Sequence, residues 1–289
     1  MSDLTVAAFQ ALRNRFFDQQ GKPIPFALRS KLNTQDDPFD EFLATDVLTG
    51  LPGVQCVKAT GPLITPDMAL YRPDQIKGLE YGRLDNDLNR LVAIEVKKLE
   101  RTSQGGVARA SGLDFNTTPP CGRVRVYNRD ERPITIRGFY LFVCLETTPG
   151  GNILTALALV DGDLLNTDYD LYMSIVGERE KRINLGSYGD GADRARPMLI
   201  FSNPLGVSEL DHAVTLVHPS GDLADGGSPL KKIHEIRRRT REGGANRFFA
   251  YRDKRDAPAT AQATLLDDPF PTPEREAKTR PRGRFRLPI

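Results

Sequence analysis

Six short apolar runs constrain this chain more than any other feature. Each is four to eight residues long, and polar or turn-forming stretches separate them. Apolar runs of that length, rich in β-branched residues, favour strands over helices. The sequence therefore predicts a sheet that contains Val54–Val57, Met68–Tyr71, Leu91–Val96, Gly138–Leu145, Ile153–Val160 and Met198–Phe201.

Three segments have helical character instead. Leu4, Ala8, Leu12 and Phe16 recur at helical spacing, which predicts a helix near the N-terminus. A second helix is expected from Phe39 to Leu48, with Asp37 as its N-cap, Pro38 at its first position and Gly50 near its end. A third, basic helix is expected from Pro229 to Arg241, capped by Ser228. Helices and strands in this order predict an α/β fold, with a central mixed β-sheet flanked by helices.

The charge is distributed unevenly along the chain. The 289 residues carry a net charge of +2, but residues 228–289 hold 16 Lys and Arg against 8 Asp and Glu, a net of +8. An acidic body with a basic C-terminal quarter indicates either a polyanionic partner or a solvated basic tail. Because no sharp break in composition divides the chain, we expect a single domain over residues 1–256 and a Pro/Arg-rich C-terminal arm over residues 257–289.

Composition also bears on location. With 39% hydrophobic and 27% charged residues, the chain is typical of globular proteins, and no apolar run is long enough to span a bilayer. The three cysteines, Cys56, Cys121 and Cys144, form no metal-ligand spacing with the histidines. Scattered thiols of this kind favour a reducing compartment, so we expect a cytoplasmic protein without a membrane partner.

The chemistry centres on two of the apolar runs. Asp67 directly precedes Met68–Tyr71, and Glu95 and Lys97 lie at the end of the run that begins at Leu91. Strand alternation places Glu95 and Lys97 on one face, together with Leu91 and Ala93, and places Lys98 on the other. Charges at such a position need a partner or a metal ion, because their burial is otherwise costly.

If Asp67 lies on the neighbouring strand, two carboxylates and a lysine converge. Two carboxylates suit Mg²⁺, which takes its remaining ligands from water and substrate phosphate. A nearby lysine would orient the attacking water or stabilise charge, so this set favours phosphodiester hydrolysis. Two alternatives stay open at this point: Asp74 of the second Pro-Asp pair replaces Asp67, or Glu95 and Lys97 form an ordinary ion pair at a sheet edge.

Pro66-Asp67 followed by Glu95-Val96-Lys97 resembles the motif of the PD-(D/E)xK nuclease superfamily, above all its Type II restriction endonucleases. The resemblance covers about a tenth of the chain. It implies a restriction-endonuclease-like fold, Mg²⁺ bound by Asp67 and Glu95, and a water-assisting Lys97. It also implies a helix carboxylate, matched by Glu41, that completes the site. Such enzymes act on double-stranded DNA as homodimers, and a cognate DNA methyltransferase belongs to the same system without a stable complex.

Cations around this motif are candidates for DNA contacts. Lys98 and Arg101 leave the strand that carries Glu95, and the basic helix presents others that could follow phosphates or reach guanine edges. The full set is Lys98, Arg101, Arg109, Arg123, Arg125, Lys231, Lys232, Arg237, Arg238, Arg239 and Arg241.

Two further hypotheses remain beside a restriction endonuclease. One is a structure-selective DNA repair nuclease with the same catalytic core, and the other is a non-catalytic DNA-binding protein that uses only the basic segments. Cleavage of DNA to discrete fragments, to a smear, or not at all distinguishes the three.

Overall fold

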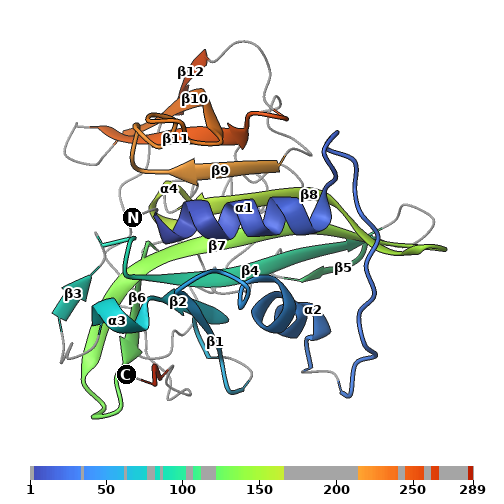
Figure 1. Cartoon of the computed structure of the whole chain (residues 1–289), viewed down its shortest axis with the longest axis horizontal. Coiled ribbons are helices and arrows are strands. Elements are labelled where there is room, and N and C mark those ends of the chain that lie inside the picture. Colours follow the sequence, from blue (N-terminus) through green and yellow to red (C-terminus); the bar gives the residue numbers. More distant parts are fainter. Residues whose placement is uncertain are drawn as a thin grey trace, which may run out of the picture.

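The computed structural model describes residues 3–33, 36–61, 64–76, 82–84, 87–101, 107–111, 122–165, 214–239, 245–256, 262–266 and 286–288. The expected Met198–Phe201 strand and Arg241 lie outside these residues. The protein is a mixed α/β structure with few helices and one large mixed sheet, in agreement with the predicted α/β class (Figure 1).

The sheet has the strand order β1-β2-β4-β7-β8-β9-β11-β10-β12, with β3 and β6 paired to β7 and β5 paired to β4. The strands are β1 (Gln55–Lys58), β2 (Met68–Tyr71), β3 (Gly82–Leu84), β4 (Leu91–Arg101), β5 (Val107–Ser111), β6 (Arg123–Tyr127), β7 (Pro133–Thr148), β8 (Gly151–Asp161), β9 (Val214–His218), β10 (Leu230–Arg239), β11 (Ala245–Asp253) and β12 (Gln262–Leu266). Strand β2 runs antiparallel to β4, and β4 runs parallel to β7. The five predicted apolar runs that fall within the described residues are all strands.

Helices α1 (Leu4–Phe16) and α2 (Pro38–Phe42), with the π-helical turn η1 (Leu43–Val47), cover one face of the sheet (Figure 1). The predicted caps are confirmed at α2, where the Asp37 side chain accepts hydrogen bonds from the backbone N–H groups of Phe39 and Asp40. The two other helices of the described residues are single turns, α3 (Pro73–Ile76) and α4 (Gly162–Leu165).

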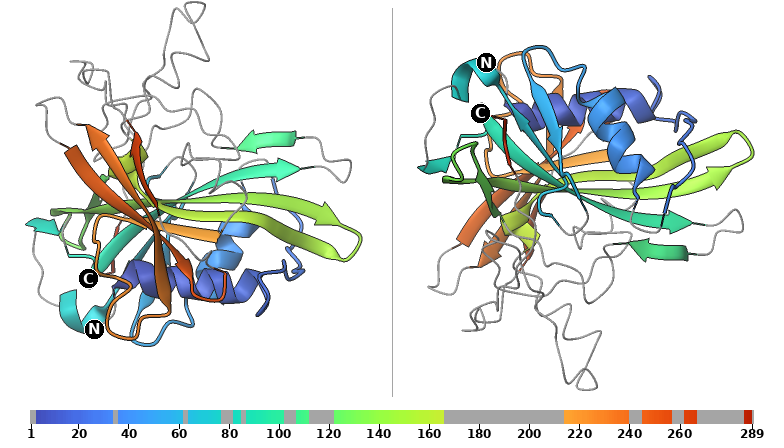
Figure 2. Two further views of the ribbon diagram at one scale, coloured as in Figure 1. Left: turned by 90° about the horizontal axis from the view of Figure 1, so that it is seen from above. Right: turned by 90° about the horizontal axis from the view of Figure 1, so that it is seen from below.

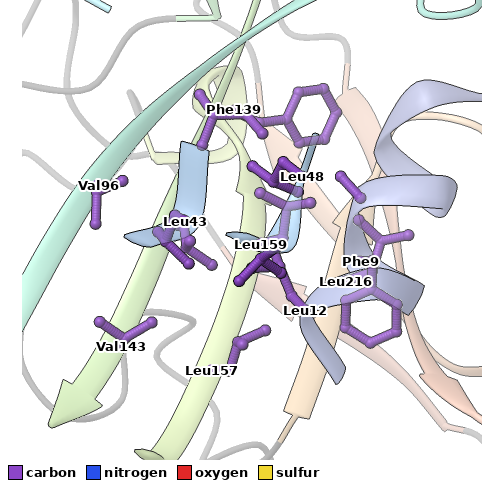
Figure 3. Close-up of a cluster of buried hydrophobic side chains, with 14 of the residues drawn as sticks. Phe9, Leu12, Leu43, Leu48, Val96, Phe139, Val143, Leu157, Leu159 and Leu216 are labelled. Carbon is purple, nitrogen blue, oxygen red and sulfur yellow. The ribbon is translucent and has the colours of Figure 1, made fainter. Parts of the chain in front are cut away.

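The main core lies between α1, α2, η1 and the sheet (Figure 3). Alternate residues of each strand face it, because successive side chains of a strand point to opposite faces. Thus Val96 on β4 and Phe139 on β7 meet Leu12 of α1 and Leu43 of η1 in one cluster. The intervening residues of the same strands form two further clusters on the opposite face.

The sheet twists strongly along its length, so β10 and β11 cross the direction of β7 and β8 at a steep angle (Figure 2). The prediction of a basic helix from Pro229 to Arg241 is wrong. Leu230–Arg239 is strand β10, which pairs with β11 and β12. The physical reason is burial across strands. Ile233 and Ile236 pack against Phe248 of β11 in a shared apolar cluster, which a strand allows and which the local spacing of basic residues did not reveal.

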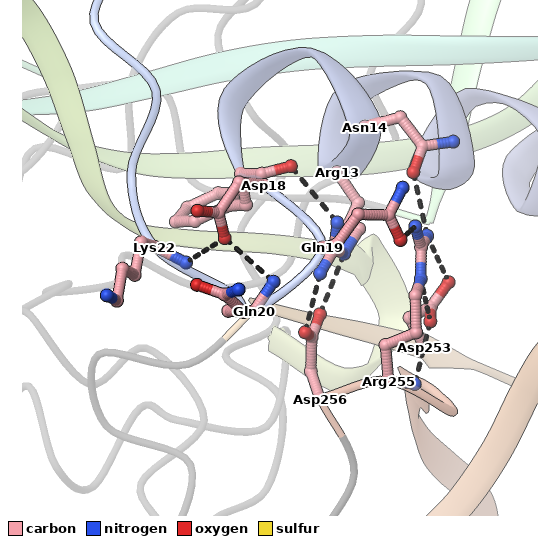
Figure 4. A network of polar contacts seen from close by, with 10 residues as sticks. Arg13, Asn14, Asp18, Gln19, Gln20, Lys22, Asp253, Arg255 and Asp256 are labelled. Carbon is pink, nitrogen blue, oxygen red and sulfur yellow. Dashed lines mark hydrogen bonds and ion pairs between the residues drawn. The ribbon is translucent and has the colours of Figure 1, made fainter.

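Polar contacts connect the first helix to the end of β11 (Figure 4). Arg13 is buried, and its Nε and Nη2 donate to the two carboxylate oxygens of Asp256 at 2.8 and 2.6 Å. Nη1 donates to the backbone oxygen of Phe17 at 3.0 Å. Beside this pair, Arg255 donates to Asp253 and to Asn14 of α1. These ion pairs fix α1 against the C-terminal strands.

Two pieces of the expected C-terminal arm are also placed. Residues 262–266 form β12, parallel to β10. Leu287 is buried beside Tyr127, whose backbone oxygen accepts a hydrogen bond from the Leu287 N–H at 2.9 Å. Within the described residues, none of the helices has the length and apolar character required to cross a membrane.

Candidate active site

The pairing of β2 with β4 brings the two halves of the sequence motif together. Met68 lies opposite Ile94, so Asp67, one residue before β2, lies beside the middle of β4, near Glu95. Its Oδ2 accepts a hydrogen bond of 2.7 Å from the backbone N–H of Val96. Asp74, the open alternative, is instead an exposed residue in the first turn of α3. The geometry therefore selects Asp67 as the aspartate that accompanies Glu95.

Glu95 and Lys97 share one face of β4, as the alternation predicts. Leu91 and Ala93 of that face belong to the third apolar cluster, whereas Val96 belongs to the main core on the other face. Lys97 Nζ donates to Glu95 Oε1 at 2.9 Å, and the two side chains are only 10% and 9% exposed. An ion pair buried to this extent differs from the exposed edge pair considered as an alternative.

The carboxyl group of Asp67 has a raised pKa. Burial, and next the negative charge of Glu95, raise its pKa to about 7, although Lys97 and the Val96 N–H act in the opposite direction. A carboxyl group with this pKa is protonated over part of the neutral range unless a cation compensates its charge. Perturbed carboxyls in such a setting are common at functional sites.

One carboxylate of α2 lies near Asp67, Glu95 and Lys97. It is Asp40 and not the expected Glu41. Glu41 pairs with the exposed Arg29, whose Nε donates to Glu41 Oε2 at 2.9 Å, and its side chain is 42% exposed. The pKa of Asp40 is well above the usual range, first because of burial and next because of the charge of Asp67. The helical phase explains the shift by one residue, since Asp40 precedes the buried Leu43 and Val47 by three and seven positions.

Lys98 corrects another expectation. It is buried at 4% exposure, faces α2, and forms an ion pair with Asp37, with Asp40 Oδ1 at 3.8 Å from its Nζ. Its ammonium group also lies 5.8 Å from the centre of the Phe39 ring. Lys98 therefore holds the N-terminus of α2 against β4 and is not positioned on a surface that DNA could contact. Because Lys98 is two positions after Val96 on β4, strand alternation places both side chains on the face that the helices cover.

Lys58 is a cation of this region that the motif does not include. It ends β1, opposite Met68 of β2. Its charge opposes the rise in pKa of both Asp40 and Asp67, so it lies near both carboxyls. No spacing rule connects Lys58 to the motif, because only the pairing of β1 with β2 brings it there.

The other expected DNA-binding cations are spread over several strands. Arg123 is half-buried and Arg125 is exposed, both on β6. The backbone places Arg101 at the end of β4, Arg109 on β5, and Arg238 and Arg239 at the end of β10; their side chains lie outside the description. Lys231, Lys232 and Arg237 lie on β10, with Lys232 and Arg237 exposed.

The carboxylate pair has the character of a cation site. Glu95 Oε2 is buried and has no hydrogen-bond partner within the described part of the chain. A buried carboxylate oxygen without a donor is costly, and a bound cation removes that cost. No three His, Cys, Asp or Glu side chains of the described residues gather closely enough to hold a metal ion. Asp67 and Glu95 therefore form a two-carboxylate set, the number that commonly anchors Mg²⁺.

Comparisons of the chain with known protein families, curated proteins and solved structures find no match. What the site can do therefore follows from its own side chains and their geometry.

Proposed function

We propose that the chain is a Type II restriction endonuclease, which hydrolyses phosphodiester bonds of double-stranded DNA with Mg²⁺ held by Asp67 and Glu95. The observation that carries the proposal is the convergence of Asp67, Glu95 and Lys97 beside one another, with Glu95 Oε2 lacking a partner among the described residues. The motif resemblance and the mixed sheet with helices on one face support a restriction-endonuclease-like fold. A homodimer acting on a palindromic site belongs to the same proposal.

Each side chain has a distinct role in this mechanism. Asp67 and Glu95 would hold the cation, beside the hydrogen bonds that they accept from the Val96 N–H and from Lys97. When bound, Mg²⁺ supplies charge stabilisation at the phosphate and acidifies a water molecule. Lys97, which pairs with Glu95, would orient the attacking water or stabilise charge on the phosphate. For the role that the resemblance assigns to Glu41 we propose Asp40, which is buried and lies near enough to Asp67 for that charge to raise its pKa.

The test is incubation of the protein with unmethylated supercoiled plasmid and Mg²⁺, with an EDTA control. We expect discrete fragments that disappear in EDTA. A smear would instead support the structure-selective repair nuclease, and plasmid that stays intact with every divalent ion tried would support a non-catalytic DNA-binding protein. Protection of the plasmid by methylation in a host that carries a cognate methyltransferase would strengthen the restriction assignment.

The pH dependence of Mg²⁺ use is a further prediction. Metal binding requires ionised carboxyls, and the pKa of Asp67 is raised to about 7 in the metal-free protein. Below pH 7 the cation must displace a proton, so its affinity falls by about tenfold per pH unit for one proton released. We expect the Mg²⁺ concentration for half-maximal cleavage to rise steeply as the pH falls from 7.5 to 6, because Asp67 becomes protonated over this interval. A half-maximal concentration that does not change over this interval would contradict the assignment of Asp67 as a ligand.

A further inference from the structure

One face of the β10–β11 pair carries two arginines and a lysine beside Phe249 and Tyr251, which are buried in the main core. In the pairing register Lys232 lies opposite Tyr251, Glu235 opposite Phe249, and Arg237 opposite Arg247. Partners in register share a face, so these six side chains project from the same side of the ribbon. Lys232 is exposed, and Arg237 and Arg247 are 50% and 58% exposed. We refer to Lys232, Glu235, Arg237, Arg247 and Phe249 as the ribbon face.

Contacts with Glu235 and Phe249 hold the three cations of the ribbon face in place. Arg237 Nε and Arg247 Nη2 each lie 2.7 Å from a carboxylate oxygen of Glu235, which lowers the pKa of that carboxyl to about 2. Lys232 and Arg247 lie 5.2 and 5.5 Å from the centre of the Phe249 ring. Three cations against one acid leave a net charge of +2 on the described side chains of this face. The acid and the aromatic ring orient the cations and thereby reduce the entropy that a ligand must remove.

The dimensions suit duplex DNA. Residues Arg247 and Tyr251 are four positions apart on β11, so the cationic pairs span about 14 Å along the strand. That distance corresponds to about four base pairs at about 3.4 Å each along one strand. Positive charge spread over such a length complements a row of phosphates.

The ribbon is also within reach of the candidate active site. Strands β7, β8 and β9 separate β4 from β11, so four steps of about 4.8 Å place the two strands about 19 Å apart. The ribbon face lies on the side of the sheet that α1 covers, because Phe249 pairs in register with His218 and Tyr251 with Leu216 of the main core. Glu95 and Lys97 lie on the other side. Adjacent strands twist by about 20–25° on average, which amounts to roughly 80–100° over four steps. In Figure 2, β10 and β11 cross β7 and β8 steeply. The cations of the ribbon face therefore point roughly at right angles to the side chains of β4. A duplex of about six base pairs is as long as the roughly 19 Å between β4 and β11.

We infer that the ribbon face is a docking surface for double-stranded DNA, on which Lys232, Arg237 and Arg247 contact backbone phosphates. This inference rests on the proposed function for the identity of the polyanion. The cations lie on a strand pair instead of the expected basic helix, and Arg247 joins those expected from the sequence. Glu235 acts as a built-in competitor of phosphate, since it already pairs with both arginines.

The test is the affinity of the metal-free protein for a labelled DNA duplex of mixed sequence, measured by fluorescence anisotropy in EDTA over a range of salt concentrations. The double variant Arg237→Gln/Arg247→Gln is expected to weaken binding uniformly across sequences. It should reduce the slope of log K against log salt by about 1.8, since each phosphate contact contributes about 0.9. Glu235→Gln is expected to act in the opposite direction, with tighter binding and a slope steeper by about 0.9.

Two matched controls remove the same charges elsewhere. Lys22→Gln/Arg129→Gln deletes two exposed cations, and Asp130→Asn deletes one exposed acid, all outside the ribbon. Both should leave affinity and slope unchanged, and thermal unfolding should show that every variant is folded. The inference is overturned if the ribbon variants leave binding unchanged, or if the controls alter it equally.

The result separates this inference from the proposed function. Intact plasmid in Mg²⁺, together with weakened binding by the ribbon variants, would overturn the nuclease and keep the ribbon as a DNA-binding surface. Cleavage that depends on Asp67, with unchanged binding by the ribbon variants, would keep the nuclease and overturn the ribbon.

Discussion

Asp67→Asn is expected to abolish DNA cleavage and, at the same time, to stabilise the metal-free protein at pH 8. Cleavage should fall by roughly 10²- to 10³-fold or more, the range for loss of one charge-stabilising group. Stability should rise because the carboxylate is held among groups that oppose its ionisation, burial first and Glu95 next. Asparagine keeps an oxygen that can accept the Val96 N–H, so the local hydrogen bond is preserved.

The sign of the stability effect depends on pH. Because the folded-state pKa of Asp67 is raised from 3.8 to about 7, the folded protein binds more protons than the unfolded chain between these values, and stability is lost as pH rises through that interval. The gain from Asp67→Asn should therefore be full at pH 8 and vanish near pH 4. Cleavage assays in Mg²⁺ and denaturant unfolding in EDTA measure the two effects. Asp74→Asn, on the exposed turn of α3, is the matched control and should change neither.

Lys97→Ala and Glu95→Ala complete this prediction. Each should remove cleavage and preserve DNA binding, because neither side chain is exposed enough to contribute much to docking. A clean Lys97→Ala protein that still cuts plasmid at the normal rate would refute the assigned chemistry.

A parallel pair, Asp40→Asn and Glu41→Gln, distinguishes the two carboxylates of α2, and only Asp40→Asn should reduce cleavage.

Arg13→Ala should cause the largest loss of stability, about 3–5 kcal/mol in the free energy of unfolding. Arg13 is 1% exposed and provides donors to Asp256 and to the Phe17 backbone oxygen. Its removal leaves the Asp256 carboxylate, only 13% exposed, without the cation that compensates it. Urea unfolding at neutral pH measures the change.

Arg15→Ala is the matched control on the same helix. Arg15 lies 4.9 Å from the centre of the Phe42 ring, a cation–π contact for which we expect a loss of only about 0.5–1 kcal/mol. The double variant Arg13→Met/Asp256→Asn should recover part of the loss, because it removes both charges together. Equal effects of Arg13→Ala and Arg15→Ala would show that the ion pair with Asp256 contributes little.

Residue spacing within one segment correctly predicted the elements whose apolar residues all lie in that segment, such as α1 and β4. The spacing of Leu4, Ala8, Leu12 and Phe16 specifies α1, since a helix places all four toward one apolar surface. Alternation along β4 correctly separated Glu95 and Lys97 from the core-facing residues, because a strand leaves a side chain only two directions.

Errors arose where a long-range partner decides the structure. Leu230–Arg239 has basic residues at intervals that a helix also produces, but Phe248 and Ala250 of β11 bury its apolar residues in a sheet. Glu41 instead of Asp40 is an error of one position on a short helix, and the buried residues Leu43 and Val47 of the following turn η1 indicate which side of that helix faces the sheet. Lys58 reaches the site only through the register of β1 with β2, and no single segment contains that information.

The bond between Arg13 and Asp256 joins residues 243 positions apart in the sequence. During synthesis at the ribosome the first helix therefore emerges long before the carboxylate that neutralises its buried arginine, and before β8 and β9, against which it packs. Contacts of such sequence separation slow folding, because the intervening chain must be ordered before they form. We expect α1 to remain with its apolar side uncovered until β8, β9 and Asp256 have been synthesised. For this chain, recombinant yield then depends on protecting the nascent helix α1, for example through slower translation or chaperone supply.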